Sequence, residues 1–407
     1  MPDPLLDALA QVPSTVPSDA RQVLAWTLAD HLACVLGASP SSGHDPTAFD
    51  ADGVSGTASD LALRASRDDR DDVDWQVLTH PGSVVWPTVL ATAARAGSRG
   101  PAVARAAFLG YRATATMAHQ LGAAHRGTWH VTATAGSFGA AAAAGAVVEL
   151  APDQQAAAFA HTAAATGGLG QAALERRGAA GFNRAAAAAR GIHAVRAAAY
   201  GAVPVEAPLD GERGLLALVG GEARAEGAAP EVVDGTASVG PRVYPVSGFG
   251  QGAVAATAEL RRAHPDDVLE ELVVEVAAPA ARLMDGSTGD RWWSLADAAA
   301  AAWATGDPFA LAPTQATQAL AGRVRVVAGD LPPGAARVRA ATDRGRHEME
   351  KGPPRPGPDL DRKWASMLAE AGRSEDPVVL AEEILAGGVT PDHLELLLST
   401  APNERQP

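Results

Sequence analysis

Two histidines, each placed just before an apolar helix, are the residues of this sequence best suited to acid–base chemistry. His80 is followed by a Pro-Gly-Ser turn and then by an apolar run through residues 84–94, so its imidazole is expected where a buried helix begins. His130 stands before a small-residue helix in GTWHVTATAGSFGAAAAAGAV. Because a helix begins with free N–H groups and the positive end of its dipole, a carboxylate or an enolate could be held beside either ring. Together they predict a cofactor-free acid–base site.

Composition limits the partners and the chemistry. At 407 residues the chain is too long for one core of ordinary size, so two domains are expected. The net charge of −14 argues against nucleic acid or an anionic membrane as partner, because both bind basic faces. A single cysteine, Cys34, excludes internal disulfides and an iron–sulfur cluster held by cysteines. The chemistry is therefore expected to need no cofactor and no metal; any metal would have only histidine and carboxylate ligands.

The N-terminal segment favours a cytoplasmic protein. Residues 1–19, MPDPLLDALAQVPSTVPSD, contain neither a basic n-region nor a sustained apolar core, so no secretory signal is predicted. The weakly polar runs elsewhere are rich in alanine and glycine and are interrupted, so no membrane span is predicted either.

Helical periodicity dominates the first half of the chain. Apolar residues recur at helical spacing, with glycine or proline between the segments. Helices are predicted at residues 20–36, 83–96, 100–121, 133–150, 152–166 and 183–200. The acidic, glycine-containing segment 48–74 is less regular, and we expect a surface loop that leads into His80.

The pattern changes after residue 235. Helices are predicted at 251–263 and 294–305, and strands in LEELVVEVAAP, RVRVVAG and AARVRAATDRG. A proline-rich linker at 350–361 follows, and predicted helices at 362–371, 377–386 and 391–398 end the chain. The middle region is therefore a small α+β domain, and the last helices could rejoin the first domain.

Eight segments together resemble the MmgE/PrpD family, which includes 2-methylcitrate dehydratase, cis-aconitate decarboxylase and an iminodisuccinate epimerase. The THPGS and HVTATAGSFGAAAAAGAV segments carry the two histidines. The others are TLADHLACVLGAS, FLGYRATATMAHQLG, GFNRAAAAARGIHAVRAAAYGA, RVYPVSGFGQGAVAATAELR, WWSLADAAAAAWATGD and DLDRKWASMLA, in the family's order.

The resemblance implies a mainly α fold. A large all-helical domain would be built from both chain ends, residues 1–238 and 358–407, with a smaller α+β lid domain inserted at 239–357. It also implies an active site in the crevice between the domains and, usually, a homodimer.

Several polar residues depart from the family pattern. The acidic run before His80 reads RDDVD at 70–74 and lacks the family's threonine, and Asn183 replaces a family histidine that follows a lysine. In the lid, Gln251 replaces a second histidine, and Asp297 stands where the family has a tyrosine.

The predicted site combines the chemistry of these residues with the resemblance. Removing a proton beside a carboxylate requires a base, an acid and cations that hold the carboxylate. Imidazole suits the base, an aspartate can orient its ring, and guanidinium binds carboxylate in bidentate fashion. The predicted catalytic residues are His80, His130, Asp72, Asp74 and Tyr244, and the predicted substrate-binding residues are Ser83, Thr132, Arg177, Asn183, Arg184, Arg242, Gln251 and Asp297.

Three functions agree with this set of residues. The first is a metal-independent dehydratase acting on a small hydroxy-carboxylate or polycarboxylate, for example in secondary metabolism. The second is a cofactor-free epimerase, isomerase or decarboxylase of the same family. The third is a catalytically degenerate binding protein, which the replaced lysine, lid histidine and lid tyrosine would favour. Each residue also has a structural alternative, since a histidine at a helix start can be a cap and charged loops are usually solvated.

Overall fold

The computed structural model describes residues 3–13, 15–38, 53–175, 179–219, 231–286 and 291–399. The protein is 59% helical and its sheets are small, which confirms the predicted mainly α class. The chain folds into two compact units, residues 1–239 with 364–407, and residues 240–363. Helix α15 (Pro358–Glu370) therefore begins in the second unit and ends in the first.

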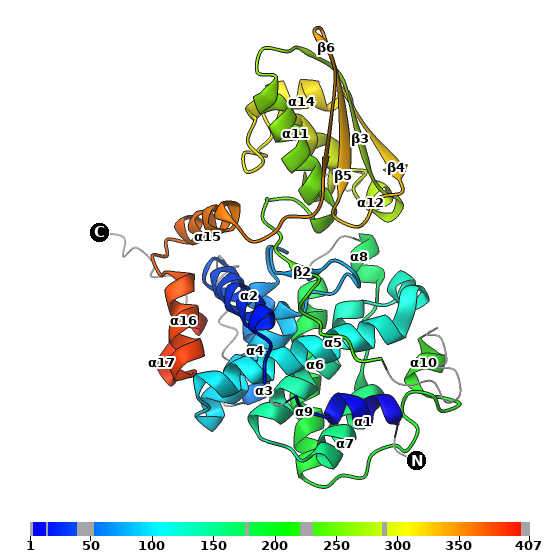
Figure 1. The fold of residues 1–407 in the computed structure, drawn as a ribbon, viewed down its shortest axis with the longest axis vertical. Coiled ribbons are helices and arrows are strands. Elements are labelled where there is room, and N and C mark those ends of the chain that lie inside the picture. Colours follow the sequence, from blue (N-terminus) through cyan, green and yellow to red (C-terminus); the bar gives the residue numbers. More distant parts are fainter. Residues whose placement is uncertain are drawn as a thin grey trace. The chain divides into compact units, whose positions relative to one another are not determined.

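The first unit, the helical unit, consists of helices from both ends of the chain. Trp364 in α15 donates its indole N–H to the buried Asp30 Oδ1 at 2.8 Å, α16 packs on α2, and α17 packs on α4 (Figure 1). Its helices are α1 (Pro4–Ala10), α2 (Ser18–Leu36), α3 (Val54–Ala65), α4 (Gly82–Ala96), α5 (Gly100–Thr128), α6 (Val131–Val147), α7 (Pro152–Ala165), α8 (Gln171–Glu175), α9 (Ala179–Ala199), α10 (Leu215–Leu218), α16 (Pro377–Gly387) and α17 (Pro391–Leu398). The short strand β1 (Val73–Asp74) precedes α4, and β2 (Val239–Gly240) lies where the units divide.

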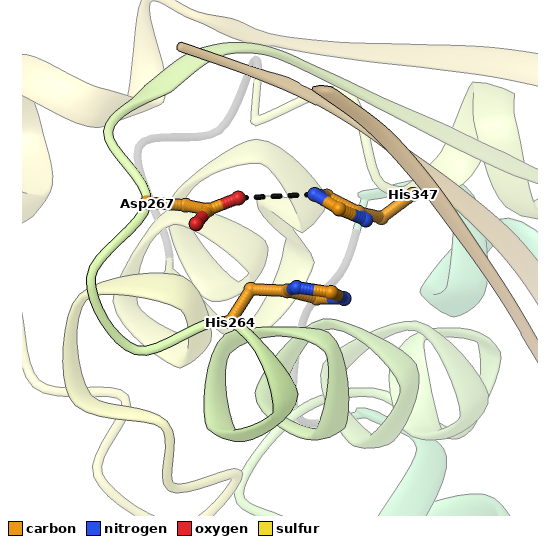
Figure 2. Close-up of side chains that lie close together, drawn as sticks. All are labelled: His264, Asp267 and His347. Carbon is orange, nitrogen blue, oxygen red and sulfur yellow. Dashed lines mark hydrogen bonds and ion pairs between the residues drawn. The ribbon is translucent and has the colours of Figure 1, made fainter. Parts of the chain in front are cut away.

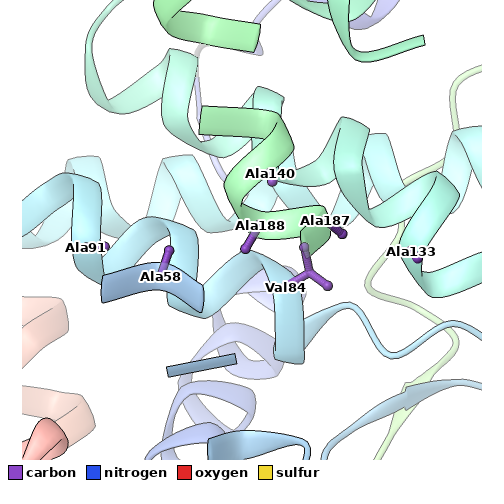
Figure 3. Close-up of a cluster of buried hydrophobic side chains, with 7 residues drawn as sticks. All are labelled: Ala58, Val84, Ala91, Ala133, Ala140, Ala187 and Ala188. Carbon is purple, nitrogen blue, oxygen red and sulfur yellow. The ribbon is translucent and has the colours of Figure 1, made fainter. Parts of the chain in front are cut away.

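Helix α6 is the centre of this unit because its residues are small and almost all buried. It packs against α4, α5, α7 and α9. A Cβ atom at Gly139 would lie 2.0 Å from Thr114 Oγ1 of α5, so only glycine permits that approach. Small apolar residues, mostly alanines, also join α3, α4, α6 and α9, where Ala58, Val84, Ala91, Ala133, Ala140, Ala187 and Ala188 form one buried cluster (Figure 3). The alanine runs are therefore packing surfaces.

Two features of the helical unit differ from the predictions. Residues 54–65 form helix α3, where an irregular loop was expected, because Ala58, Leu61, Ala62 and Ala65 bury one face. Helix α5 continues past the predicted end to Thr128, but Gly122 interrupts it with φ 73°.

The second unit, the α+β unit, contains one mixed sheet of order β4-β3-β5-β6. Strands β3 (Leu269–Ala277) and β4 (Val324–Gly329) are parallel, whereas β5 (Ala336–Thr342) pairs antiparallel with β3 and with β6 (Gly345–Lys351). Helix α11 (Gln251–Ala263) packs on β5 and β6. The remaining elements are η2 (Gly248–Gly250), α12 (Ala278–Leu283), η3 (Arg291–Trp293), α13 (Leu295–Thr305) and α14 (Gln315–Ala321).

Strand β6 was not predicted, because its alternating charged residues have little strand propensity. In the sheet, Arg337 and Arg339 of β5 form ion pairs with Glu350 and Glu348 of β6. In the part of the chain that the structure describes, no helix has both the length and the apolar character needed to cross a bilayer.

Candidate active site

His80 lies in the loop that enters α4, and two hydroxyl side chains hold its main chain. The His80 N–H donates to Thr132 Oγ1 of α6 at 3.1 Å, and Ser83 Oγ donates to the His80 carbonyl at 2.8 Å. Both hydroxyl residues are buried. Ser83 and Thr132, predicted to bind substrate, thus position the backbone of His80 in this structure.

The tautomer of His80 follows from its ring contacts. Its Nδ1 lies 2.8 Å from the main-chain carbonyl oxygen of Asp72, and a carbonyl can only accept, so Nδ1 carries the hydrogen. Nε2 then carries the lone pair that a general base uses. Asp71 Oδ2, 3.9 Å from Nδ1, favours the imidazolium that forms when Nε2 takes a proton. The side chain of His80 is 18% exposed, so part of it is open to solvent.

The two predicted orienting carboxylates have other partners. Asp72 Oδ2 accepts from the Tyr111 hydroxyl at 2.7 Å and Oδ1 accepts from the Gly82 N–H at 2.9 Å. Burial, and secondly the charge of Asp71, raises the pKa of Asp72 to about 7. Asp74 Oδ1 accepts from Ser238 Oγ at 2.7 Å and from main-chain N–H groups of its own turn. In this structure Asp72 contacts the His80 ring through its main-chain carbonyl, and the carboxylate near that ring belongs to Asp71. A catalytic role of the Asp72 or Asp74 carboxylate stays a prediction.

Arg184 of α9 connects this loop to the helical core. Its guanidinium is 2% exposed and lies 3.2 Å from Asp71 Oδ1 and 3.1 Å from Asp69 Oδ1. The predicted carboxylate clamp is thus already ion-paired, and a substrate carboxylate would have to share it. Asn183 donates to the Leu169 carbonyl at 3.4 Å, and Arg177 lies outside the described residues.

His130 is the N-cap residue of α6 and belongs to the same electrostatic cluster. Its main-chain N–H donates to the Gly168 carbonyl at 3.0 Å, and its Nδ1 is buried with no hydrogen-bond partner among the described residues. Burial, and then the charges of Arg184 and His80, lowers the pKa of His130 to about 3. The ring is therefore neutral at physiological pH, so a protonated ring nitrogen of His130 can donate a hydrogen bond to an anion.

Three buried groups near this cluster were not among the predicted site residues. Asp71 was passed over within an acidic run that looked solvated, yet it is 2% exposed. Tyr111 is fully buried, and burial followed by the charge of Asp72 raises its pKa. His31 of α2 is 2% exposed; burial lowers its pKa to about 3, although Asp71 opposes the shift. Of these three residues, only Asp71 could have been predicted from the sequence, because it is the neighbour of Asp72.

The remaining predicted residues lie in the α+β unit. Gln251 is fully buried: its Oε1 accepts from the main-chain N–H groups of Val243 and Tyr244, and its Nε2 donates to two carbonyls. The Tyr244 hydroxyl donates to Asp359 Oδ2 at 2.8 Å; burial, and then this hydrogen bond, raises its pKa.

Two further predicted ligands have different environments. Arg242 is 2% exposed, whereas Asp297 is exposed in the first turn of α13, where Ser294 Oγ accepts from its N–H. Contact of these four residues with a substrate stays a prediction.

Comparison with known proteins supports the helical unit's identity. Residues 54–228, which contain His80, His130, Asp71 and Arg184, match the model of the MmgE/PrpD N-terminal domain. No curated protein matches the chain. The matched segment runs from α3 to α10 and includes α4, α6 and α9, the helices at which His80, His130 and Arg184 lie. The chain therefore contains an MmgE/PrpD N-terminal domain, and the MmgE/PrpD family includes lyases and dehydratases.

Proposed function

We propose that the protein is a metal- and cofactor-independent hydro-lyase that dehydrates a small hydroxy-carboxylate or polycarboxylate. The observation that carries this proposal is the tautomer of His80, whose Nδ1 lies 2.8 Å from the Asp72 carbonyl and 3.9 Å from Asp71. A partly exposed imidazole with its lone pair on Nε2 and a buried carboxylate behind it is suited to removing a proton from carbon.

In the first step, His80 Nε2 takes the proton next to the substrate carboxylate. The electron pair of that C–H bond forms an enolate, and Asp71 stabilises the imidazolium. His130 stays neutral beside Arg184 and donates a hydrogen bond to the enolate oxygen as charge develops. His130 and the neighbouring Arg184 would therefore stabilise the enolate without transferring a proton to it.

In the second step, the enolate electron pair forms the C=C bond while the bond to the β-hydroxyl breaks. The hydroxide leaves as water with the proton from the His80 imidazolium, which restores the neutral base. Tyr244 is the predicted alternative proton donor, although its hydroxyl proton is directed to Asp359 in this structure.

Epimerisation is the second candidate function, since it needs two proton carriers and no leaving group. The mutual electrostatic influence of His80 and His130 favours it. The low pKa of His130 argues against it, because a second carrier must hold a proton near neutral pH.

The proposal is tested by incubating the protein with a panel of small hydroxy- and unsaturated carboxylates in deuterium oxide and following products by NMR. Dehydration gives an unsaturated acid, and epimerisation gives the deuterated diastereomer. Removal of an essential base by His80→Asn should lower the rate by about 10² to 10⁴-fold. His193→Asn is the matched control, because the exposed ring of His193 bonds to Ser55 at the surface. A product that forms equally fast with His80→Asn would overturn the assignment.

The proposal includes a cytoplasmic homodimer with a role in secondary metabolism. Exposed apolar side chains after α9 and in α10 support the dimer: Tyr200 and Val203 are each 91% exposed, and Leu218 is 67% exposed. Val205 and Leu218 also line one pocket of about 350 Å³, whose lining residues include neither His80 nor His130. A second copy of the chain is the partner that we propose for this surface.

A further inference from the structure

Three side chains with metal-ligating atoms converge in the α+β unit, far in sequence from the proposed acid–base site. His264 caps the C-terminal end of α11, Asp267 lies in the loop before β3, and His347 lies on β6. Figure 2 shows the two imidazole rings face to face with the carboxylate directed at His347. One ligand atom from each residue lies within 4.8 Å of the other two.

The distances are close to those that one ion requires. His347 Nε2 lies 3.0 Å from Asp267 Oδ2. Two ligand atoms about 2.1 Å from a tetrahedral zinc ion are roughly 3.4 Å apart, so this pair needs only a small adjustment. The rings of His264 and His347 stack with centroids 3.5 Å apart, and His264 lies just beyond the last helical residue. Because the lone pair of an imidazole lies in the plane of its ring, binding of one ion by both histidines requires the His264 side chain to rotate out of this stack.

The chemical types of the three side chains suit a metal ion, because imidazole nitrogens and carboxylate oxygens are the atoms that bind zinc and similar ions in proteins. Two charged groups lie near the Asp267 carboxylate. The Arg344 guanidinium is 4.0 Å away, and Asp266 lies 3.8 Å from the same guanidinium.

Hydrogen bonds orient the carboxylate from behind. Thr342 Oγ1 of β5 donates to Asp267 Oδ2 at 2.8 Å, and Arg261 of α11 donates to the Asp267 carbonyl at 2.9 Å. The Asp267 side chain is 6% exposed and that of His347 is 20% exposed. The site is thus partly shielded yet open to a small ion. Hydrogen bonds hold Asp267 in place, as they hold the ligands of known metal sites.

We propose that His264, Asp267 and His347 bind one divalent transition-metal ion of the zinc class. Two imidazole nitrogens and one carboxylate oxygen suit zinc and its neighbours, and they leave a coordination position for water. The ion would join the end of α11 to β6. The ligands Asp267 and His347 are 80 positions apart in the chain. The site lies in a different unit from His80 and His130, and the proposed dehydration does not depend on it.

The test uses the full-length protein after treatment with a chelator and dialysis. Zinc chloride is titrated by calorimetry, and the melting temperature is measured with and without zinc. We expect one ion per chain and a saturable rise in melting temperature, since a ligand that binds only the native state stabilises it. Cobalt(II) provides a second readout, because its visible absorption reports the ligands and their geometry.

Variants assign the binding to these residues. His264→Gln and His347→Gln keep the side-chain volume and should each weaken zinc binding at least about 10-fold, and Thr342→Val, which removes an orienting hydrogen bond, should weaken it by roughly 10 to 100-fold. His393→Gln is the control, since His393 lies in the first turn of α17 in the helical unit and is not one of the proposed ligands. Circular dichroism verifies that each variant is folded. Absence of a saturable one-ion event, or binding that is unchanged in both histidine variants, would refute the site.

Discussion

At the residue scale, burial decides how the charged groups of the site behave. Asp71, Asp72 and Arg184 are each 2% exposed, although Asp71 and Asp72 belong to a run that reads as a solvated loop. Charge in sequence does not reveal burial, because a buried ion pair and a surface acid have the same residue types. The two histidines could be predicted from their position before helices. The sequence could not predict which carboxylate lies beside the His80 ring, because that depends on the conformation of the loop.

The titration of His130 is a direct measure of this burial. We expect ¹⁵N NMR of histidine-labelled protein to show His130 neutral well below pH 6.5, because burial lowers its pKa to about 3. The signal is assigned by its loss in His130→Asn. A bound carboxylate would offset the charge of Arg184 and raise this pKa. A His130 that titrates at its ordinary pH of about 6.5 would mean that the ring is solvated.

His31 should make stability depend on pH. Its folded pKa of about 3 lies below the ordinary 6.5, so the unfolded chain binds more protons and stability is lost as pH falls from 6.5 towards 3. At pH 5 His31 alone lowers the free energy of unfolding by about 2 kcal/mol relative to pH 8. Asp72 acts oppositely between about pH 4 and 7, because its folded pKa is raised.

The variant His31→Leu separates the two effects. It removes the cost of an imidazole that has no hydrogen-bond partner among the described residues, and Asp72 is unchanged. Urea unfolding gives the difference in the free energy of unfolding between the variant and the wild type. We expect this difference to be about 2 kcal/mol more favourable to the variant at pH 5 than at pH 8. An equal difference at both pH values would show that His31 is not kept neutral by burial.

At the element scale, the helical unit depends on close approach between small residues. Periodicity predicted most of its helices because alanine and leucine recur on their buried faces. It missed α3, where glycine and aspartate interrupt the buried apolar face. It also missed β6, whose charged residues form cross-strand ion pairs with β5. The kink at Gly122 was also missed, because a glycine within a helix is compatible with either a straight or a broken helix.

Substitution of Gly139 tests the packing of α6 on α5. In Gly139→Ala the new methyl group would lie 2.0 Å from Thr114 Oγ1 and 2.8 Å from the Gly110 carbonyl, so one helix must move. We expect a loss of about 1–3 kcal/mol in the free energy of unfolding, measured with urea. Gly127→Ala in α5 is the control, because its methyl group meets nothing within 4 Å, and it should be neutral or slightly stabilising. Equal effects of the two substitutions would contradict the packing argument.

At the scale of the whole molecule, both ends of the chain contribute to one unit. The α+β unit is inserted between them, and its buried Gln251 holds a main-chain turn where the family pattern has a histidine. This exchange replaces a titratable group by a fixed amide. The acid–base chemistry that we propose therefore rests on the helical unit, in which both histidines lie.

The proposed homodimer is a prediction at this scale. Light scattering after size exclusion should give twice the chain mass of 41.3 kDa. The double substitution Val203→Glu with Leu218→Glu should give monomers, because it places charges on exposed apolar residues of the proposed interface. Val268→Glu, at a residue 58% exposed in the α+β unit, should leave the dimer intact. A wild-type monomer would reject this interface.

The central claim is that His80 removes a proton from carbon. Its most direct test is the rate at which a carboxylate from the panel acquires deuterium next to its carboxyl group, compared between the wild type, His80→Asn and His193→Asn. We predict exchange in the wild type and in His193→Asn, with a loss of at least about 10²-fold in His80→Asn. Exchange that survives unchanged in His80→Asn would contradict the account.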